Sequence, residues 1–169
     1  MTKQQKTLAL LMRTMIKYDG GDVPRIQHFV KVHDFARTIG IAEDMEDEEL
    51  FVLEAAAILH DVGIHAAEAK YGDCNGKHQE ELGPDEAREV LAEVDGFTTT
   101  QIERICWLIA HHHTYTNVNS QDHRILLEAD FLVNSFEDNV SKKEIVTFRN
   151  HVFRSKSAIA MLNDMWGLE

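Results

Sequence analysis

The sequence has few cysteines, few prolines and no long apolar run, and each shortage excludes a class of protein. Only Cys74 and Cys106 occur among the 169 residues, so the chain has neither a CxxC metal motif nor a disulfide framework. A reducing cytoplasm is therefore the expected compartment. No apolar run reaches the roughly 18 residues that cross a bilayer, and we expect no membrane contact. The two prolines and the absence of strand-like alternation favour helices throughout.

Positive charge is also scarce. The chain has 17 Lys and Arg against 29 Asp and Glu, which gives a formal net charge of −12 with histidine neutral. Non-specific binding to a nucleic-acid polymer needs an excess of Lys and Arg facing phosphates, so that function is excluded. The same balance argues against a basic helix on a membrane surface. Histidine, by contrast, is abundant at ten residues.

The spacing of apolar residues predicts one all-α domain, residues 1–169, of about eight helices. Capping boxes are expected at Thr100 with Glu103 and at Ser141 with Glu144, and Pro84 is expected to open a helix. Residues 64–77 contain two glycines and are expected to form a polar loop. The helices are expected over about 3–17, 24–40, 50–59, 84–94, 100–113, 121–136 and 156–166, with a further helix beginning at the Ser141 capping box and a short helical piece near His78.

Two aspartates lie in strongly apolar contexts. Asp61 follows His60 at the end of the apolar run Leu50–Leu59, where it meets the negative end of a helix dipole and partial desolvation. Asp130 lies inside the apolar segment Ile125–Val133, where an ionised carboxylate needs a partner or a metal. A capped polar turn at Asp61 and an Arg or Lys partner for Asp130 are the alternatives. Glu128 is about 200° round the helix from Asp130 and is expected to face water.

Histidines are the other candidates. His28 shares a stripe with Val32 and Ile39, but His33 also continues an apolar line, so spacing does not choose between them. His111, His112 and His113 follow one another, and neighbours on a helix point about 100° apart, so all three cannot meet one ion. One core histidine between two solvated neighbours is the alternative. If these groups converge, a nitrogen and oxygen donor set without thiolate suits Fe, Mn, Co or Zn.

The order His28, His60-Asp61, Asp130 resembles the HD superfamily of metal-dependent phosphohydrolases. The contexts RIQHFVKVHDFA, LEAAAILHDVG, IERICWLIAHH and ILLEADFLV carry this resemblance over roughly residues 20–137. It implies an HD-domain-like helical bundle in which His28, His60, Asp61 and Asp130 hold one divalent metal. Residues 141–166 would then form a C-terminal helical cap.

Members of the superfamily with two metals have further histidines between the HD pair and the last aspartate. His78 resembles the first of these, and a surface histidine is its alternative. His111 or His112 resembles the second, and His112 fits better because apolar residues precede it at three, four and seven positions. In that arrangement Asp61 would bridge the two metals. No Gly-Tyr-Pro follows the histidines, which argues against a cyclic-dinucleotide substrate.

The resemblance implies hydrolysis of a phosphate ester of a nucleotide or small phosphorylated metabolite. The cofactors would be one or two divalent ions, with Fe or Mn favoured and Co, Mg, Zn or Ni open. Asp61 would be the central catalytic residue. Arg25, about one turn before His28, and Lys77 are candidates to bind the phosphate, although both could be plain surface residues.

Two other functions stay open. A di-iron oxygenase of the same superfamily would activate O₂, with Tyr71 or Tyr115 closing over the substrate. A non-catalytic, metal-stabilised module would bind a nucleotide or partner, but the full set of candidate ligands argues against it. Met161, Met165 and Trp166 form either a closing cap or a homodimer contact. The remaining histidines, His65, His123 and His151, are expected at the surface.

Overall fold

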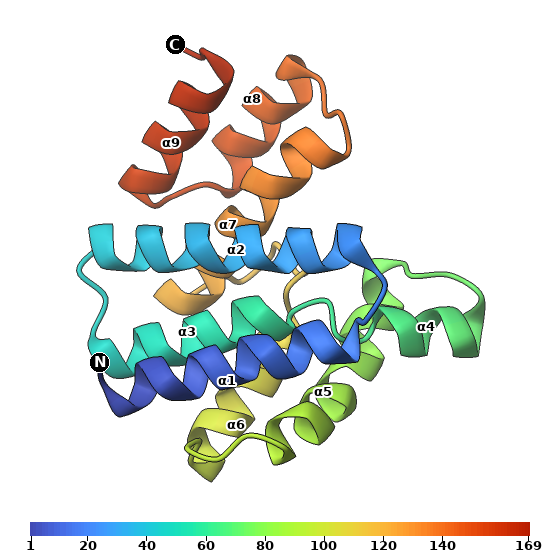
Figure 1. The fold of residues 1–169 in the computed structure, drawn as a ribbon. Coiled ribbons are helices and arrows are strands. Elements are labelled where there is room, and N and C mark those ends of the chain that lie inside the picture. The colour runs from blue at the N-terminus through green and yellow to red at the C-terminus, as the bar shows by residue number, and fades with distance from the viewer.

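The computed structural model describes residues 1–169 and contains nine helices and no strand, which confirms the all-α prediction (Figure 1). There is one helix more than the eight expected. The helices are α1 (Lys3–Tyr18), α2 (Val23–Ala42), α3 (Asp47–Leu59), α4 (Ile64–Tyr71), α5 (Gly76–Ala92), α6 (Thr99–Ile109), α7 (Gln121–Glu137), α8 (Lys142–Val152) and α9 (Lys156–Trp166).

Helix α3 is the central helix of the core. Its residues Phe51–Leu59 are all buried, and α1, α2, α6 and α7 pack around it. Burial of each of its large side chains, such as Leu53 or Ile58, contributes about 1.5–3 kcal/mol. By length and composition, the stretch Asp47–Tyr71 could cross a membrane. However, 78% of its most apolar 18-residue window is buried inside the fold. Its apolar character is therefore that of a core helix.

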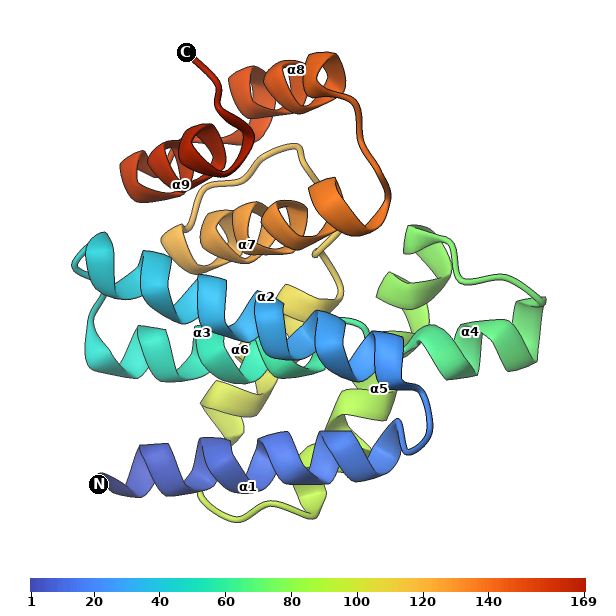
Figure 2. The same ribbon diagram turned by 45° about the horizontal axis from the view of Figure 1, so that its top comes forward.

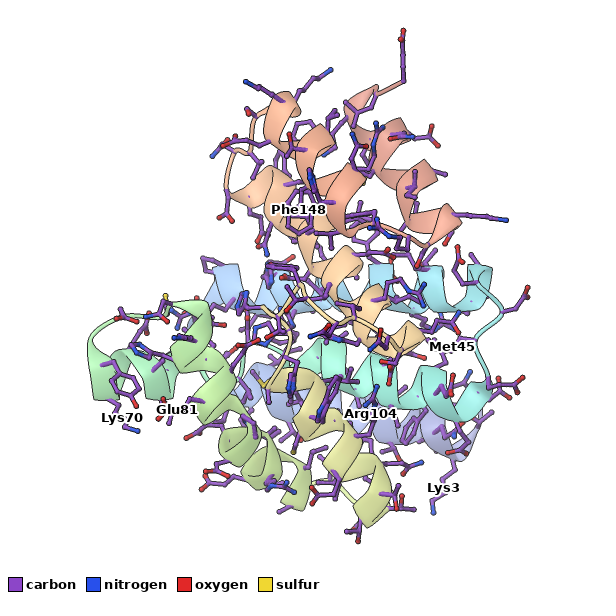
Figure 3. All side chains as sticks on the ribbon, turned by 180° about the vertical axis from the view of Figure 1, so that it is seen from behind. Lys3, Met45, Lys70, Glu81, Arg104 and Phe148 are labelled. Atoms are coloured by element: carbon purple, nitrogen blue, oxygen red, sulfur yellow. The ribbon has the colours of Figure 1, made fainter.

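The segment after α3 differs from the expected polar loop, because it contains α4. Ile64 and Ala67 of α4 are buried, and Gly72 ends the helix with a φ of 77°. A salt bridge of 3.1 Å between Lys70 and Glu81 joins α4 to α5 at this projecting end of the molecule (Figure 3). The burial of two apolar side chains thus outweighs the turn signals of the glycines.

Helix α5 begins eight residues before Pro84, which lies inside the helix and not at its start. A close approach of two glycines holds α5 against the turn that follows α3. A Cβ on Gly63 would lie 2.8 Å from the backbone nitrogen of Gly83, and a Cβ on Gly83 would lie 2.6 Å from the side chain of Ile109. Only glycine permits this contact, which packs α5 against the turn that contains Gly63 and against α6.

The ends of α6 also differ from the expectation. Its capping box is formed by Thr98 and Gln101, while Glu103 pairs with Arg88 at 2.9 Å. The helix ends at Ile109, four residues before His113. The capping box of Ser141 and Glu144 at the start of α8 is confirmed.

Helices α8 and α9 lie over α7, on the side of the molecule away from α1 (Figure 2). Glu128 of α7 is completely buried beneath them and accepts hydrogen bonds from the backbone nitrogens of Arg154 (2.6 Å) and Ser155 (3.0 Å). The expectation that Glu128 faces water was therefore wrong, because the α8–α9 pair covers that face of α7. Met161 and Trp166 of α9 pack against the core, whereas Met165 is 46% exposed.

Candidate metal centre

Three helices bring their polar side chains to one buried point. His28 comes from α2, His60 follows α3 directly, and Asp130 comes from α7. Nε2 of His28 lies 3.1 Å from Nε2 of His60 and 3.2 Å from Oδ1 of Asp130. All three residues are buried. We call this set the first donor group.

Asp61 extends the first donor group toward a second. Its Oδ2 lies 3.4 Å from Nε2 of His60 and 3.5 Å from Nε2 of His28. Its other oxygen, Oδ1, lies 3.4 Å from Nε2 of His112. The ligand atoms of Asp61, His112 and His113 also lie within 4.8 Å of one another, and we call them the second donor group. One carboxylate therefore faces both groups.

The orientation of the histidine rings is set by their other nitrogens. Nδ1 of His60 donates to the carbonyl of Ala57 (2.8 Å), and Nδ1 of His112 donates to the carbonyl of Ile109 (2.7 Å). A carbonyl can only accept, so these hydrogen bonds place a proton on Nδ1 and turn Nε2 toward the donor groups. His28 is held in the same way, since its Nδ1 lies 2.7 Å from Oε2 of Glu137. Such outer contacts are typical of metal-binding histidines.

One nitrogen of the second group has no hydrogen-bonding partner in the protein. Nε2 of His112 is buried and makes no hydrogen bond. Leaving a buried polar atom unpaired costs about 1–3 kcal/mol, so this position calls for an explanation. A metal ion at the second donor group would supply the missing partner. The nitrogen and carboxylate donors fit Fe, Mn, Co or Zn, and no thiolate is present among them.

The electrostatics of the first group also fit a cation. Burial alone would raise the pKa of Asp130, but hydrogen bonds from His28 and His60 outweigh it and lower that pKa below its usual value. Burial would lower the pKa of His28, but Asp130 and Asp61 outweigh it and raise that pKa to about 9. The two ionised carboxylates therefore attract positive charge, which a proton or a divalent cation can provide. Asp130 pairs with these histidines and not with an Arg or Lys.

A family model for the HD domain matches residues 25–135. The chain belongs to the HD domain family. The match spans both donor groups and ends before α8 and α9, which lie outside it. The fold of this chain is also similar to that in the crystal structure of a predicted HD superfamily hydrolase from an uncultured Thermotogales bacterium. The two chains share 24% identity with a TM-score of 0.66, over 94% of this chain and 84% of that chain. A search of curated proteins found no match.

This HD chain does not bring His78 or His111 into either donor group. His78 stacks on Tyr71 with 3.9 Å between ring centroids, and its Nδ1 lies 2.7 Å from Asp73. His111 stacks on Trp107 at 4.1 Å and donates from Nδ1 to the carbonyl of that residue. Neither residue is included in the ligand set proposed below, and mutation of each tests the prediction from the sequence. Trp107 is 39% exposed, so it lies at the surface beside His111.

His113 belongs to the second donor group, and sequence reasoning missed it. The periodicity that favoured His112 was extended through His113 as helix, but α6 ends at Ile109 and the following turn directs both side chains inward. Burial lowers the pKa of His113 to about 4, which keeps the ring neutral and able to bind a metal. A Cβ on Gly76 would lie 2.7 Å from this ring, so the start of α5 approaches it closely.

The two predicted phosphate-binding residues lie outside both groups. Arg25 donates to Glu68 at 2.6 Å, pairs with Asp22 at 3.1 Å and contacts His65 at 2.9 Å. Lys77 is exposed beside His78. Their roles in phosphate binding stay predictions.

The other histidines divide between the surface and the interior. His65 and His151 are partly or fully exposed. The surface prediction for His123 was wrong, because this residue is 1% exposed and its Nε2 donates to the carbonyl of His111. His33, which spacing could not separate from His28, pairs instead with Glu54 at 2.9 Å.

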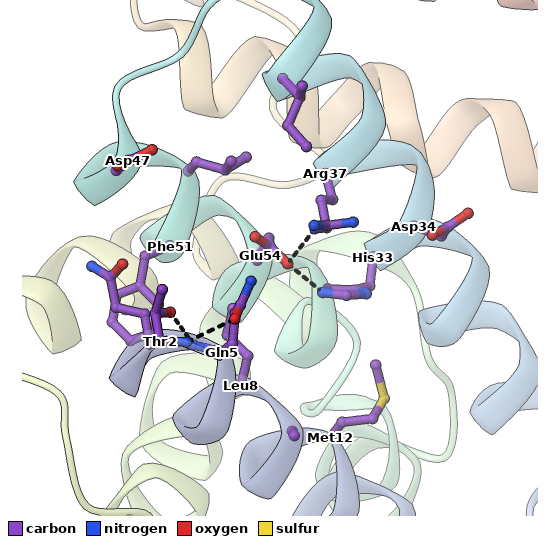
Figure 4. Close-up of a pocket in the computed structure, with 14 residues that line it drawn as sticks. Thr2, Gln5, Leu8, Met12, His33, Asp34, Arg37, Asp47, Phe51 and Glu54 are labelled. Atoms are coloured by element: carbon purple, nitrogen blue, oxygen red, sulfur yellow. Dashed lines mark hydrogen bonds and ion pairs between the residues drawn. The ribbon is translucent and has the colours of Figure 1, made fainter.

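That His33–Glu54 pair lines a cavity of 550 Å³ between α1, α2 and α3, shown in Figure 4. Arg37 also reaches Glu54 there, with 3.6 Å between nitrogen and oxygen. No residue of the donor groups lines this cavity. Cavity size alone therefore does not mark the candidate metal centre, which is identified by its converging ligands.

Proposed function

We propose that this protein is a metal-dependent phosphohydrolase that cleaves a phosphate ester of a nucleotide or small phosphorylated metabolite. The observation that carries the proposal is the carboxylate of Asp61, which lies between two groups of histidine and aspartate donors. Membership of the HD domain family supports it. The name of the Thermotogales neighbour, a predicted HD superfamily hydrolase, agrees with the same reaction class.

In this proposal His28, His60, Asp61 and Asp130 hold one divalent ion, and Asp61, His112 and His113 hold a second. Iron or manganese is favoured. Ions bound in this way lower the pKa of a coordinated water and polarise phosphoryl oxygens. Because the chain has a net charge of −12, such ions also provide the positive charge that an anionic substrate needs.

Hydrogen bonds with neighbouring residues fix the orientation of the candidate ligands. Glu137 accepts a hydrogen bond from Nδ1 of His28. The side-chain amide of Asn134 donates to Oδ1 of Asp130 at 2.9 Å. These contacts fix ligand atoms before any substrate arrives, which is the usual role of an outer shell. Arg25 and Lys77 are proposed to bind phosphate, and Arg25 would have to exchange its contact with Glu68 for the substrate. We place the protein in the cytoplasm, where exposed Cys74 would stay reduced.

The proposal is tested by phosphate release. The chain loaded with Mn²⁺ or Fe²⁺ would be assayed on nucleoside monophosphates, dinucleotides and sugar phosphates, beside the Asp61→Asn variant. We expect release from at least one class that requires the metal and is lost in the variant. Equal release by the variant, or none from any ester, would overturn it. Oxygen consumption with Fe²⁺ in the same assays would identify an oxygenase instead.

A further inference from the structure

The start of α5 packs against the turn that carries His113. Glu80 of α5 accepts hydrogen bonds from the backbone nitrogen of His113 (3.0 Å) and from Oγ1 of Thr114 (2.9 Å). A Cβ on Gly76 would lie 2.7 Å from both Cγ and Cδ2 of the His113 ring, so a side chain at this position would displace the ring. Contacts from α5 therefore hold both the backbone and the ring of His113.

Gln79, the neighbour of Glu80 on α5, contacts the same ring with an amide whose orientation is fixed. The side chain is buried, and its Nε2 donates to the carbonyl of Cys74 at 2.6 Å. A carbonyl can only accept, so the amide nitrogen must face Cys74 and the amide oxygen must face the other way. That oxygen, Oε1, lies 3.4 Å from Nε2 of His113 and forms a hydrogen bond with it.

The contact with Gln79 determines which nitrogen of His113 carries the proton. An amide oxygen can only accept, so Nε2 of the neutral ring donates and Nδ1 keeps the lone pair. Nδ1 makes no hydrogen bond in the protein, in contrast to the backbone nitrogen and Nε2 of the same residue. It is the ring atom opposite the bond between Nε2 and Cδ2, the two atoms that approach Gln79 and Gly76. Nδ1 is therefore directed away from α5.

His113 differs in this respect from its neighbour His112. Nδ1 of His112 donates to the carbonyl of Ile109, which leaves the lone pair on Nε2. His113 finds its acceptor across the fold, on α5, and keeps its lone pair on the other nitrogen. The ligand atoms of Asp61, His112 and His113 lie within 4.8 Å of one another. Two adjacent histidines thus offer different nitrogens to the second donor group.

We propose that Gln79 is a positioning residue for the second donor group, because it keeps the proton of His113 on Nε2. His113 then binds the second ion through Nδ1, whereas His112 binds it through Nε2. The inference rests on the metal centre of the proposed function and assigns the ligand atoms of its second site. Gln79 acts through His113, as outer contacts of metal-binding histidines do.

NMR of the histidine nitrogens tests the ligand atom directly. The full chain, with ¹⁵N-labelled histidine, would be measured without metal and after loading with Zn²⁺, a diamagnetic ion that imidazole binds well. The His113→Ala variant identifies the signals of this ring. We expect a proton on Nε2 of His113 in both states, and a shift of its Nδ1 signal when Zn²⁺ is added. A proton on Nδ1 of His113, or no effect of Zn²⁺ on its Nδ1, would overturn the inference.

Variants of Gln79 test its role in metal binding. Gln79→Met keeps a similar length without an acceptor, and we expect it to weaken binding of the second Zn²⁺ about 10–100-fold and to leave the first unchanged. Gln79→Glu keeps an oxygen that accepts from Nε2 and should restore most of the affinity. Gln27→Met, which changes an exposed glutamine of α2, is the matched control.

A calorimetric titration with Zn²⁺ gives both affinities. Wild-type affinity for the second ion in Gln79→Met would show that the amide does not position the ligand, and would overturn the inference. Thermal unfolding of the variant checks that it is folded. If Gln79→Met does not fold, the protonation of His113 in the wild-type chain still decides the question.

These measurements separate the inference from the hydrolase assignment, because neither uses turnover. If His113 is protonated on Nε2 and its Nδ1 responds to Zn²⁺, but no ester is cleaved, the proposed function fails and the role of Gln79 stands. If esters are cleaved but His113 carries its proton on Nδ1, the hydrolase assignment stands and the role of Gln79 is wrong.

Discussion

Oδ1 of Asp61 lies 3.4 Å from Nε2 of His112, a buried nitrogen that has no hydrogen-bonding partner. The second oxygen of the same carboxylate lies 3.4 Å from Nε2 of His60. One side chain at the end of the central helix therefore links two sets of potential metal ligands.

Replacement of Asp61 should weaken metal binding at both donor groups. Asp61→Asn keeps the side-chain shape but removes the charge that both groups share. We expect metal affinity to fall by more than about 100-fold, since loss of an outer contact alone costs about 10–100-fold. Metal content after dialysis, measured by mass spectrometry, gives the result. The control is Asp138→Asn, an exposed carboxylate just after α7, and equal metal retention in both variants would contradict the account.

The second donor group should depend on His113 and not on His78 or His111. His113→Ala removes a ligand and is expected to lower the metal content of a fully loaded chain by about one ion. His78→Ala and His111→Ala change rings that stack on Tyr71 and Trp107, outside the group, and should keep the wild-type content. Loss of an ion in His78→Ala with none lost in His113→Ala would reverse the assignment.

Glu137 should act through His28. Its carboxylate accepts the Nδ1 proton of His28 and also pairs with Lys31. Glu137→Ala is expected to weaken metal binding about 10–100-fold, and Glu137→Gln, which keeps an acceptor, less. Lys31→Met breaks only the exposed ion pair and is the matched control. A metal titration that ranks Lys31→Met with Glu137→Ala would show that the charge network, and not the ring orientation, is what matters.

The ion pair between Arg104 and Asp122 should make folding sensitive to acid. Burial raises the pKa of Asp122, but two hydrogen bonds from Arg104, at 2.7 and 2.8 Å, outweigh it and lower the pKa below 3.8. The folded state therefore binds this proton less readily than the unfolded state, so the stabilisation is present above pH 3.8 and lost as pH falls below it.

Asp122→Asn should lower the free energy of unfolding at neutral pH by about 1–2 kcal/mol, a range that allows for solvent screening of half-exposed Arg104. Urea unfolding at a series of pH values would show the difference from wild type shrinking in acid. A difference that is constant with pH would mean that lost packing, and not the ion pair, is responsible.

Local patterns were enough to predict much of the fold and to make His60, Asp61 and Asp130 candidates, whereas the choice of His28 over His33 came from the HD resemblance. The stripe that contains His28, the apolar run before His60 and the buried context of Asp130 are each visible within one helix, because a helix repeats every 3.6 residues. The structure brings these residues together, as the HD resemblance implied. The all-α class and the capping box at Ser141 were predictable for the same reason.

The features that sequence reasoning missed depend on contacts between distant segments. Glu128 is buried because α9, some thirty residues later, begins on top of it. His123 is buried because the turn after α6 folds back to accept its hydrogen bond. His113 enters the second donor group because α6 stops at Ile109 and Gly76 leaves room beside the ring. None of these contacts has a signal within one helix.

The number of metal ions bound per chain tests the central claim most directly. Protein purified without chelator and without oxygen would be loaded with Mn²⁺ or Fe²⁺, desalted and analysed for metal by mass spectrometry. The account predicts about two ions per chain, one for each donor group. A chain that retains no divalent metal after loading would contradict the metal centre and the hydrolase mechanism built on it.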